Sequence, residues 1–263
     1  MTRTALELDH GAERPAGTPN ALLLHGLASD SSIWAAVRDD LPDCRVRTAE
    51  LPWRGEGVAD WQFGSDPVVW LDRAAEAVGD PLHVLVAHSF ASGLALDWAC
   101  RRSPAAASLK ALVLVSPFYR SSAADFDWDA MAYYLENFHW ILAEGIRTRA
   151  RRPVDPEVAL GMAVHVRNRI GPYAWMRFFN TYTATPFLPL SELDLPCLVL
   201  SGRGDRAAFT ADSEALAAVL PRAELHVFED CGHFPMQEAP AEFAKTVTDF
   251  IARTTTAETR ETP

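Results

Sequence analysis

The stretch that decides the fold is Val84-Leu85-Val86-Ala87-His88-Ser89-Phe90-Ala91-Ser92-Gly93, where an apolar run passes directly into a helical pattern. The serine at the junction has the layout of a nucleophile elbow, a sharp turn that lifts the hydroxyl above the carboxyl edge of a sheet. This turn brings two backbones close together, so the residues two before and two after the serine must be small. Here both are alanine. A serine at a strand-to-helix junction is also a common helix cap, so other residues must support the interpretation.

A serine hydroxyl becomes a nucleophile only when a base removes its proton, which requires a histidine held by a carboxylate. Downstream, the apolar run 198–200 leads into Ser201-Gly202-Arg203-Gly204-Asp205, a glycine-rich turn that ends in an acid. Asp205 is therefore the predicted acid, although an aspartate in such a turn also serves as a surface or capping residue. Asp230 and Asp194 are the alternative acids.

The predicted base is His233, in the run Glu229-Asp230-Cys231-Gly232-His233-Phe234 that follows the next strand-like segment. Of the eight histidines, only His25, His88 and His233 lie where a predicted strand meets a loop. The others fall in predicted strands, in a long helical segment or in the polar N-terminal stretch: His83, His226, His139, His165 and His10.

Short apolar runs alternate with amphipathic stretches of helical period, which predicts βαβ units and an α/β fold with a mostly parallel sheet. The predicted strands are 21–24, 45–49, 83–86, 112–115, 197–200 and 224–228. The predicted helices are 32–41, 68–78, 90–102, 213–220 and 241–253.

One long segment interrupts this alternation. Between Val115 and Cys197 the chain shows helical patterning without a convincing strand, over far more than the handful of residues expected of an αβ loop. We therefore expect a core domain of residues 1–116 and 191–253, a helical cap of residues 117–190 and a free polar tail of residues 254–263.

The expected cap holds all five tyrosines and many of the other aromatic residues. Aromatic side chains there either pack the cap onto the core or line a cavity beneath it. We expect most of them to pack, and take Trp140, Trp175 and Phe179 as the first choices for substrate contact.

Negative charge develops on the carbonyl oxygen of a substrate attacked by serine, so the site needs an oxyanion hole. The backbone N–H of Phe90, directly after the serine, is one predicted donor. The N–H of Leu27 is the other, in the loop His25-Gly26-Leu27 after the first predicted strand, where Gly26 permits close approach. His25, His88 and Phe234 are further candidates for substrate contact.

At this point the sequence resembles the α/β-hydrolase superfamily, in particular its lidded esterases, thioesterases and carbon–carbon bond hydrolases. Serine, acid and histidine follow each other in the order typical of that fold, each after a predicted parallel strand. Matching pieces run through most of the chain: Leu24-His25-Gly26 with Ser32 and Trp34, Glu50-Leu51-Pro52-Trp53-Arg54-Gly55, Ala87-His88-Ser89-Phe90-Ala91, Gly204-Asp205, and Cys231-Gly232-His233 with Glu238 and Pro240. The resemblance implies a central mostly parallel sheet, helices on both faces and a helical cap.

The chain departs from the superfamily pattern in two places. Both elbow glycines are replaced, by Ala87 and Ala91, and arginines stand on either side of Asp205. The serine nucleophile also excludes the epoxide hydrolases and haloalkane dehalogenases of this fold, which use an aspartate.

Composition excludes several other classes of function. With 24 basic against 35 acidic residues, the net charge of −11 gives no basic surface for nucleic acid. The four cysteines lack the spacing of a disulfide framework or a zinc site, so no metal and no cofactor are expected. A small, largely apolar molecule is the expected partner, and the sequence does not predict an oligomeric state.

The N-terminal stretch is acidic where a signal peptide needs a basic flank, and no apolar run reaches about 18 residues, so we expect a cytoplasmic protein without membrane contact. Only Lys110 and Lys245 are lysines, and this preference for arginine, with the many alanines, indicates a bacterial source.

Three functions remain open at this stage. The leading one is hydrolysis of an ester, thioester or related acyl bond through an acyl-enzyme. A cyclase, lyase or carbon–carbon bond hydrolase would use the same residues. A ligand-binding receptor on a hydrolase scaffold is the third, and the intact set of Ser89, Asp205 and His233 argues against it.

Overall fold

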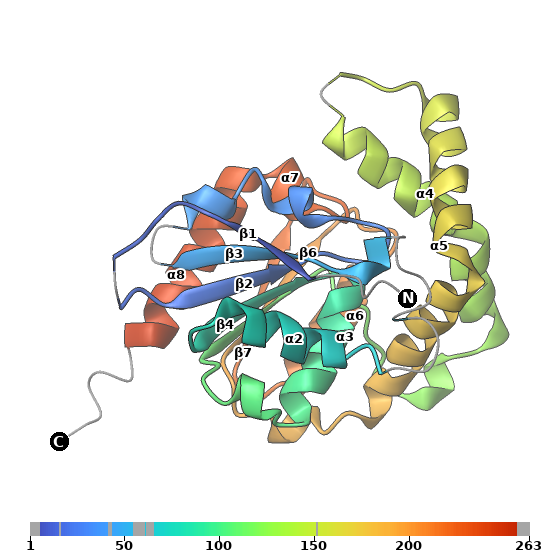
Figure 1. The fold of residues 1–263 in the computed structure, drawn as a ribbon. Coiled ribbons are helices and arrows are strands. Elements are labelled where there is room, and N and C mark those ends of the chain that lie inside the picture. Colours follow the sequence, from blue (N-terminus) through green and yellow to red (C-terminus); the bar gives the residue numbers. More distant parts are fainter. Residues whose placement is uncertain are drawn as a thin grey trace.

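The computed structural model describes residues 6–15, 17–41, 44–54, 61, 66–150 and 152–256. Its sheet has seven strands in the order β1-β3-β2-β4-β5-β6-β7 (Figure 1). β1 is antiparallel to β3 and every other neighbouring pair is parallel, which confirms the predicted α/β class. The strands are β1 (Glu7–His10), β2 (Asn20–Leu24), β3 (Arg45–Glu50), β4 (Leu82–His88), β5 (Ala111–Val115), β6 (Cys197–Gly202) and β7 (Ala223–Phe228).

The central strands are apolar on both faces because helices cover both faces of the sheet. All five residues of β2 and all five of β5 are buried. Six predicted strands are present, but β1 was missed. Its sequence, Glu-Leu-Asp-His, is mostly exposed at the sheet edge and carries no apolar run to reveal it.

The sheet separates two apolar cores. On one face pack α2 (Val69–Val78), α3 (Phe90–Cys100) and α6 (Thr210–Val219), with Leu22, Leu85 and Leu112. On the other face pack α7 (Pro235–Glu238) and α8 (Pro240–Thr256), with Leu23 and Val86.

The helix predicted over 32–41 is wrong. The chain there forms two short 3-10 helices, Ser31–Trp34 and Arg38–Asp40, held by bonds between residues three apart. Ile33, Trp34 and Val37, whose spacing indicated an amphipathic helix, are buried all the same, because two short turns are enough to bring them onto the sheet.

Two long helices, α4 (Trp128–Arg149) and α5 (Pro156–Ala184), fill most of the segment between β5 and β6. They run side by side and stand at one end of the sheet (Figure 1). α5 bends at Gly171, whose φ of 74° is followed by Pro172. Short 3-10 turns, Ala123–Asp125, Thr185–Phe187 and Leu190–Glu192, connect the pair to the sheet.

The last helix is longer than expected. α8 continues to Thr256, and the Thr254 hydroxyl donates to the carbonyls of Phe250 and Ile251 within it. The expected tail therefore begins inside a helix, and residues 257–263 lie outside the described residues.

Two features are absent from the described ranges. No helix there has both the length and the apolar character needed to cross a bilayer. Within the same residues, no group of three or more histidine, cysteine or acidic side chains is arranged to hold a metal ion.

Gly202 joins the sheet to the loop that carries the predicted base. A Cβ at Gly202 would lie 2.1 Å from the Gly232 carbonyl oxygen and 2.5 Å from that of Cys231, so a side chain there must displace backbone. We expect Gly202→Ala to destabilise the fold by about 1–3 kcal/mol, read as a lower melting temperature. Gly161→Ala is the matched control, because nothing lies within 4 Å of its Cβ position in α5. Equal melting temperatures for the two variants would contradict the close approach of the loops.

Candidate active site

Ser89 stands at the sharp turn between β4 and α3. Its φ of 58° and ψ of −123° are costly for a residue with a side chain, and such strain is characteristic of a nucleophile elbow. The Ser89 N–H donates to the Val115 carbonyl at 2.8 Å, which holds the turn against β5. Ala87 and Ala91 are completely buried, so their methyl groups fit where glycines are usual.

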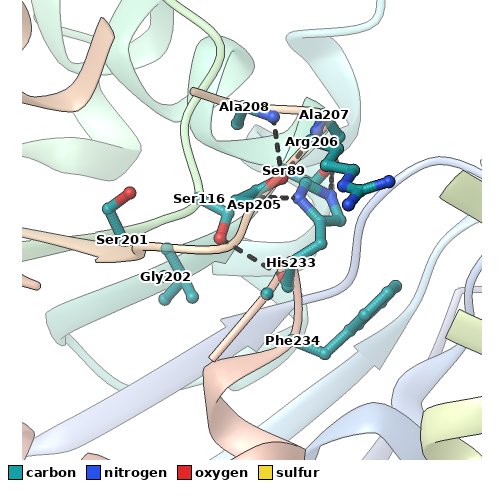
Figure 2. A network of polar contacts seen from close by, with 12 residues as sticks. Ser89, Ser116, Ser201, Gly202, Asp205, Arg206, Ala207, Ala208, His233 and Phe234 are labelled. Atoms are coloured by element: carbon teal, nitrogen blue, oxygen red, sulfur yellow. Dashed lines mark hydrogen bonds and ion pairs between the residues drawn. The ribbon is translucent and has the colours of Figure 1, made fainter. Parts of the chain in front are cut away.

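The predicted serine, histidine and acid lie in hydrogen-bond contact (Figure 2). His233 Nε2 is 3.0 Å from Ser89 Oγ, and His233 Nδ1 is 2.8 Å from Asp205 Oδ2. All three residues are buried. These contacts fit a catalytic triad, in which the base reaches the nucleophile through one ring nitrogen and its orienting acid through the other.

Asp205 is held by backbone donors on its far side. Its Oδ1 accepts from the N–H of Ala207 at 2.7 Å and of Ala208 at 3.0 Å, while Oδ2 faces His233. The carboxylate therefore has one fixed orientation. The alternative acids, Asp230 and Asp194, are both exposed and neither contacts His233.

A glutamate whose role the sequence did not reveal holds the loop that carries His233. Glu238, in α7, accepts from the N–H groups of Gly232 at 2.8 Å and Phe234 at 2.9 Å. The His233 carbonyl accepts from His88 Nε2 at 2.9 Å and from the Ser116 hydroxyl at 3.3 Å. His88 thus supports the base, and its ring also borders the cavity described below.

Cap helix α4 also contacts the loop that carries His233. Glu144 Oε1 lies 2.7 Å from the position that a Cβ at Gly232 would take, and a Cβ at Gly145 would lie 2.7 Å from Phe234 Cζ. Gly145 therefore gives the Phe234 ring its place under the helix. Burial and the carboxylates of Asp205 and Glu238 raise the pKa of Glu144, although the charge of His233 opposes them.

Opposing effects act on the predicted base. Burial alone would lower the pKa of His233, but the charge and hydrogen bond of Asp205, with the charge of Glu144, outweigh it and raise that pKa. A general base must be neutral to accept a proton, so activity requires a pH above this raised value.

We expect kcat/KM for an ester to rise with pH through a midpoint above about 6.5, the ordinary value for histidine. Rates measured across neutral pH give this midpoint. In Glu144→Gln, which lacks one of the charges that raise this pKa but keeps Asp205, the midpoint should move to lower pH. A wild-type midpoint below the ordinary value would contradict the described environment of His233.

The loop after β2 lies directly against the nucleophile. A Cβ at Gly26 would be 2.8 Å from Ser89 Cβ, so only glycine allows this approach. The Ala28 N–H donates to Trp53 and the Ser29 N–H to Gly26, which fixes the loop around Leu27.

His25 has a structural place in this loop. Its Nδ1 donates to the Gly26 carbonyl at 2.9 Å, and its Nε2 accepts from the Leu51 N–H at 3.0 Å. It is completely buried and does not line the cavity, which corrects its selection as a substrate contact.

A narrow cavity of about 40 Å³ opens beside Ser89. The predicted site residues on its wall are Leu27, His88, Ser89, Phe90, His233 and Phe234. The cap contributes residues that the sequence did not single out, together with Phe118 from the β5 loop: Phe138, Ile141, Leu142, Gly145 and Phe178. No aspartate, glutamate, lysine or arginine of the described residues lines it.

The three cap residues chosen from the sequence lie elsewhere. Trp140 is 56% exposed, and Trp175 packs on Phe138 with ring centroids 3.8 Å apart. Phe179 is half-buried against the core. None of the three lines this cavity, because Phe138 and Phe178 occupy the inward positions of their helices. Trp140 instead lines an open groove on the other side of α4.

The sequence of the chain is similar to those of known hydrolases. Residues 21–246 match the model of the "Alpha/beta hydrolase family". A pimeloyl-[acyl-carrier protein] methyl ester esterase from Aromatoleum aromaticum is 27% identical, over 89% of this chain and 98% of its own. A 2-hydroxymuconate semialdehyde hydrolase from Pseudomonas sp. is 30% identical, over 90% of this chain and 88% of its own.

A solved structure shares the fold. The crystal structure of a bacterial membrane phospholipase A superposes with a TM-score of 0.70, at 23% identity, over 95% of this chain and 83% of that one. At this level of identity the likeness concerns the fold alone.

Proposed function

The chain belongs to the alpha/beta hydrolase family and is a hydrolase, and from this premise we propose that it cleaves an ester, thioester or related acyl bond of a small, largely apolar substrate. The observation that carries the proposal is the contact of His233 with both Ser89 and Asp205 at the wall of an apolar cavity. In this proposal residues 117–190 act as the cap of a core made by residues 1–116 and 191–253.

Ser89 is the proposed nucleophile and His233 its base. Ser89 Oγ attacks the substrate carbonyl while its proton passes to His233 Nε2, and Asp205 stabilises the resulting imidazolium through Nδ1. His233 then gives that proton to the leaving oxygen or sulfur, which departs and leaves an acyl-enzyme. Water, deprotonated by the same nitrogen, attacks the acyl carbon and releases the acid and free Ser89.

The N–H groups of Leu27 and Phe90 are the proposed oxyanion donors. Both residues border the cavity next to Ser89, and Phe90 begins α3, where the first N–H groups of a helix have no partner within the helix. The described hydrogen bonds of the β2 loop use the N–H groups of Ala28 and Ser29, not that of Leu27.

The cavity favours a short acyl group. About 10–15 Å³ of such space holds one water, so 40 Å³ accepts roughly three non-hydrogen atoms, the size of an acetyl group. Aromatic rings of the cap and of Phe118 close it, and apolar walls of this kind select by size.

We expect Phe178→Ala to enlarge the cavity and shift the preference of the enzyme toward longer acyl chains. Phe178 is buried on the cavity wall, with its ring centroid 4.9 Å from that of Phe118. The ratio of kcat/KM for a hexanoate ester to kcat/KM for an acetate ester should rise. The rise should correspond to about 1–3 kcal/mol of transition-state binding free energy. Trp128→Ala is the control, because this side chain is 87% exposed on the same cap and should leave the ratio unchanged. An unchanged ratio in Phe178→Ala would mean that specificity is set elsewhere.

Carbon–carbon bond hydrolysis is the second candidate, favoured by the 30% identity to the semialdehyde hydrolase. The decisive experiment presents the purified protein with acyl esters and thioesters of graded length and with 2-hydroxymuconate semialdehyde, the compound in the name of that relative. Turnover of the esters or thioesters alone supports acyl hydrolysis. Turnover of the semialdehyde alone transfers the assignment to carbon–carbon cleavage, and turnover of neither contradicts both.

A further inference from the structure

A second hollow lies beside the catalytic cavity. It is an open groove of about 780 Å³ between cap helix α4 and the turn that carries Asp205. Gly204 and Arg206, the two immediate chain neighbours of Asp205, form its core side, and Ile141 belongs to the walls of both hollows. The groove therefore borders the site on the side of its acid.

Helix α4 forms the partition between the two hollows. Phe138, Leu142 and Gly145 are four and three residues apart, so they share the face that lines the cavity. Asn137, Glu144 and Arg147 are offset from them around the helix and line the groove. Ile141 lines both hollows.

The groove carries a net positive charge. Arg147 and Arg206 are exposed on its wall, and no ion pair is described for either guanidinium within the residues that the structure describes. Figure 2 shows the Arg206 side chain extending away from the triad, on the side to which Phe234 also points. Glu144 is the only acidic side chain among the described lining residues, so the two arginines outnumber it; burial raises its pKa, and the charge of Arg206 acts in the opposite direction.

The backbone at the base of Arg206 is held in place. The Tyr133 hydroxyl donates to the Arg206 carbonyl at 2.6 Å, and Asn137 donates to the Tyr133 carbonyl at 2.8 Å. This chain of contacts ties the acid turn to α4. An anion between the two arginines would thus be bound by a site whose walls are already joined.

We propose that the groove binds an anionic group, a carboxylate, on the leaving portion of the substrate, while the cavity takes the short acyl portion. This inference rests on the proposed acyl hydrolysis and names its substrate class. Two guanidinium groups provide planar pairs of donors that match carboxylate oxygens. The cavity has no counterpart for such a charge, so an anionic group on the acyl side would be disfavoured.

The position of the base agrees with this division. His233 delivers the proton to the leaving oxygen, and Asp205, behind it, belongs to the turn that forms the groove. A leaving alcohol that departs past Ile141 enters the groove, and the remaining acetyl-enzyme stays in the cavity.

The test compares two esters that differ only in charge, 3-acetoxybenzoate and its neutral analogue 3-acetoxybenzamide. We expect the wild-type kcat/KM to be about tenfold higher for the benzoate, with added salt reducing the difference. In Arg206→Gln and Arg147→Gln the preference should fall toward equality through a higher KM for the benzoate. Arg203→Gln is the matched control, because Arg203 stands on the same turn but pairs with Glu229 at 3.0 Å and lies outside the groove.

Binding without turnover separates this inference from the proposed function. Calorimetric titration of both esters into Ser89→Ala reports affinity when no hydrolysis occurs. We expect Ser89→Ala to bind the benzoate more tightly than the benzamide, and the double variant with Ser89→Ala and Arg206→Gln to lose this difference. That result supports an anion site in the groove even if the wild-type protein hydrolyses neither ester. Equal affinity, or binding of neither ester, overturns the groove proposal while leaving acyl hydrolysis of other esters to stand. A parallel fall in turnover of both esters in Arg206→Gln also overturns it, because the arginine would then act through Asp205.

Discussion

Replacing Ser89 by alanine is expected to lower acyl turnover by about 10⁴- to 10⁶-fold, since among the described residues the hydroxyl in contact with His233 Nε2 is that of Ser89. Ser89 Oγ is the atom that His233 Nε2 reaches at 3.0 Å, and the loop at Gly26 packs against its Cβ. Alanine keeps that Cβ, so the elbow should remain folded. Steady-state rates with an acetate ester, together with the melting temperature, measure both effects.

Ser92→Ala provides the matched control for this prediction. Ser92 lies one turn along α3, is equally buried, and its hydroxyl donates to the Ala87 carbonyl at 2.7 Å instead of contacting His233. We expect this variant to lose some stability and keep its turnover. If Ser89→Ala retained turnover near the wild-type rate, the nucleophile would have to be another residue.

The second large effect is expected from Asp205→Asn, which should lower kcat by about 10⁴-fold. The N–H groups of Ala207 and Ala208 point at Oδ1, so the oxygen of an asparagine must take that place and its amide nitrogen must face His233. That amide donates to Nδ1 and forces the ring proton onto Nε2. Nε2, the ring nitrogen that faces Ser89, then has no lone pair with which to accept the proton of the hydroxyl.

Asp230→Asn is the control for the acid, because Asp230 lies on the same stretch of chain as His233 but is exposed. Its rate should match that of the wild type. A large loss in Asp230→Asn combined with a small one in Asp205→Asn would transfer the role of the acid to Asp230.

The parallel sheet and the meeting of Ser89, Asp205 and His233 could be predicted because each depends on a local pattern. A buried apolar run is needed for every central strand, and a small-residue turn must follow it where a functional side chain leaves the sheet. The edge strand β1 has neither feature. It pairs only with β3, and the side chains of Glu7 and Asp9 are exposed to solvent, so no apolar run is needed there.

The wall of the cavity could not be predicted in the same way. Phe138 and Trp140 are equally apolar in sequence, and only the packing of α4 against Phe234 and Gly232 decides which of them faces Ser89. The contact of Glu144 with the loop of His233, and the role of Glu238, which the sequence shows only as part of the superfamily pattern, could not be predicted for the same reason. The Glu238 carboxylate of α7 accepts from the backbone beside His233, the Glu144 carboxylate of α4 lies next to Gly232, and no spacing in the chain links the two residues.

The most direct test of the central claim is covalent labelling of the wild-type protein with a fluorophosphonate, followed by mass mapping of the digested chain. The reagent reacts with a serine whose proton is removed by a neighbouring base, and Ser89 is held against His233 Nε2 in that way. One adduct per chain, on the peptide that contains Ser89, is the predicted result. An adduct on a different residue, or hydrolysis of esters by a protein that takes up no label, would contradict the assignment of Ser89 as the nucleophile.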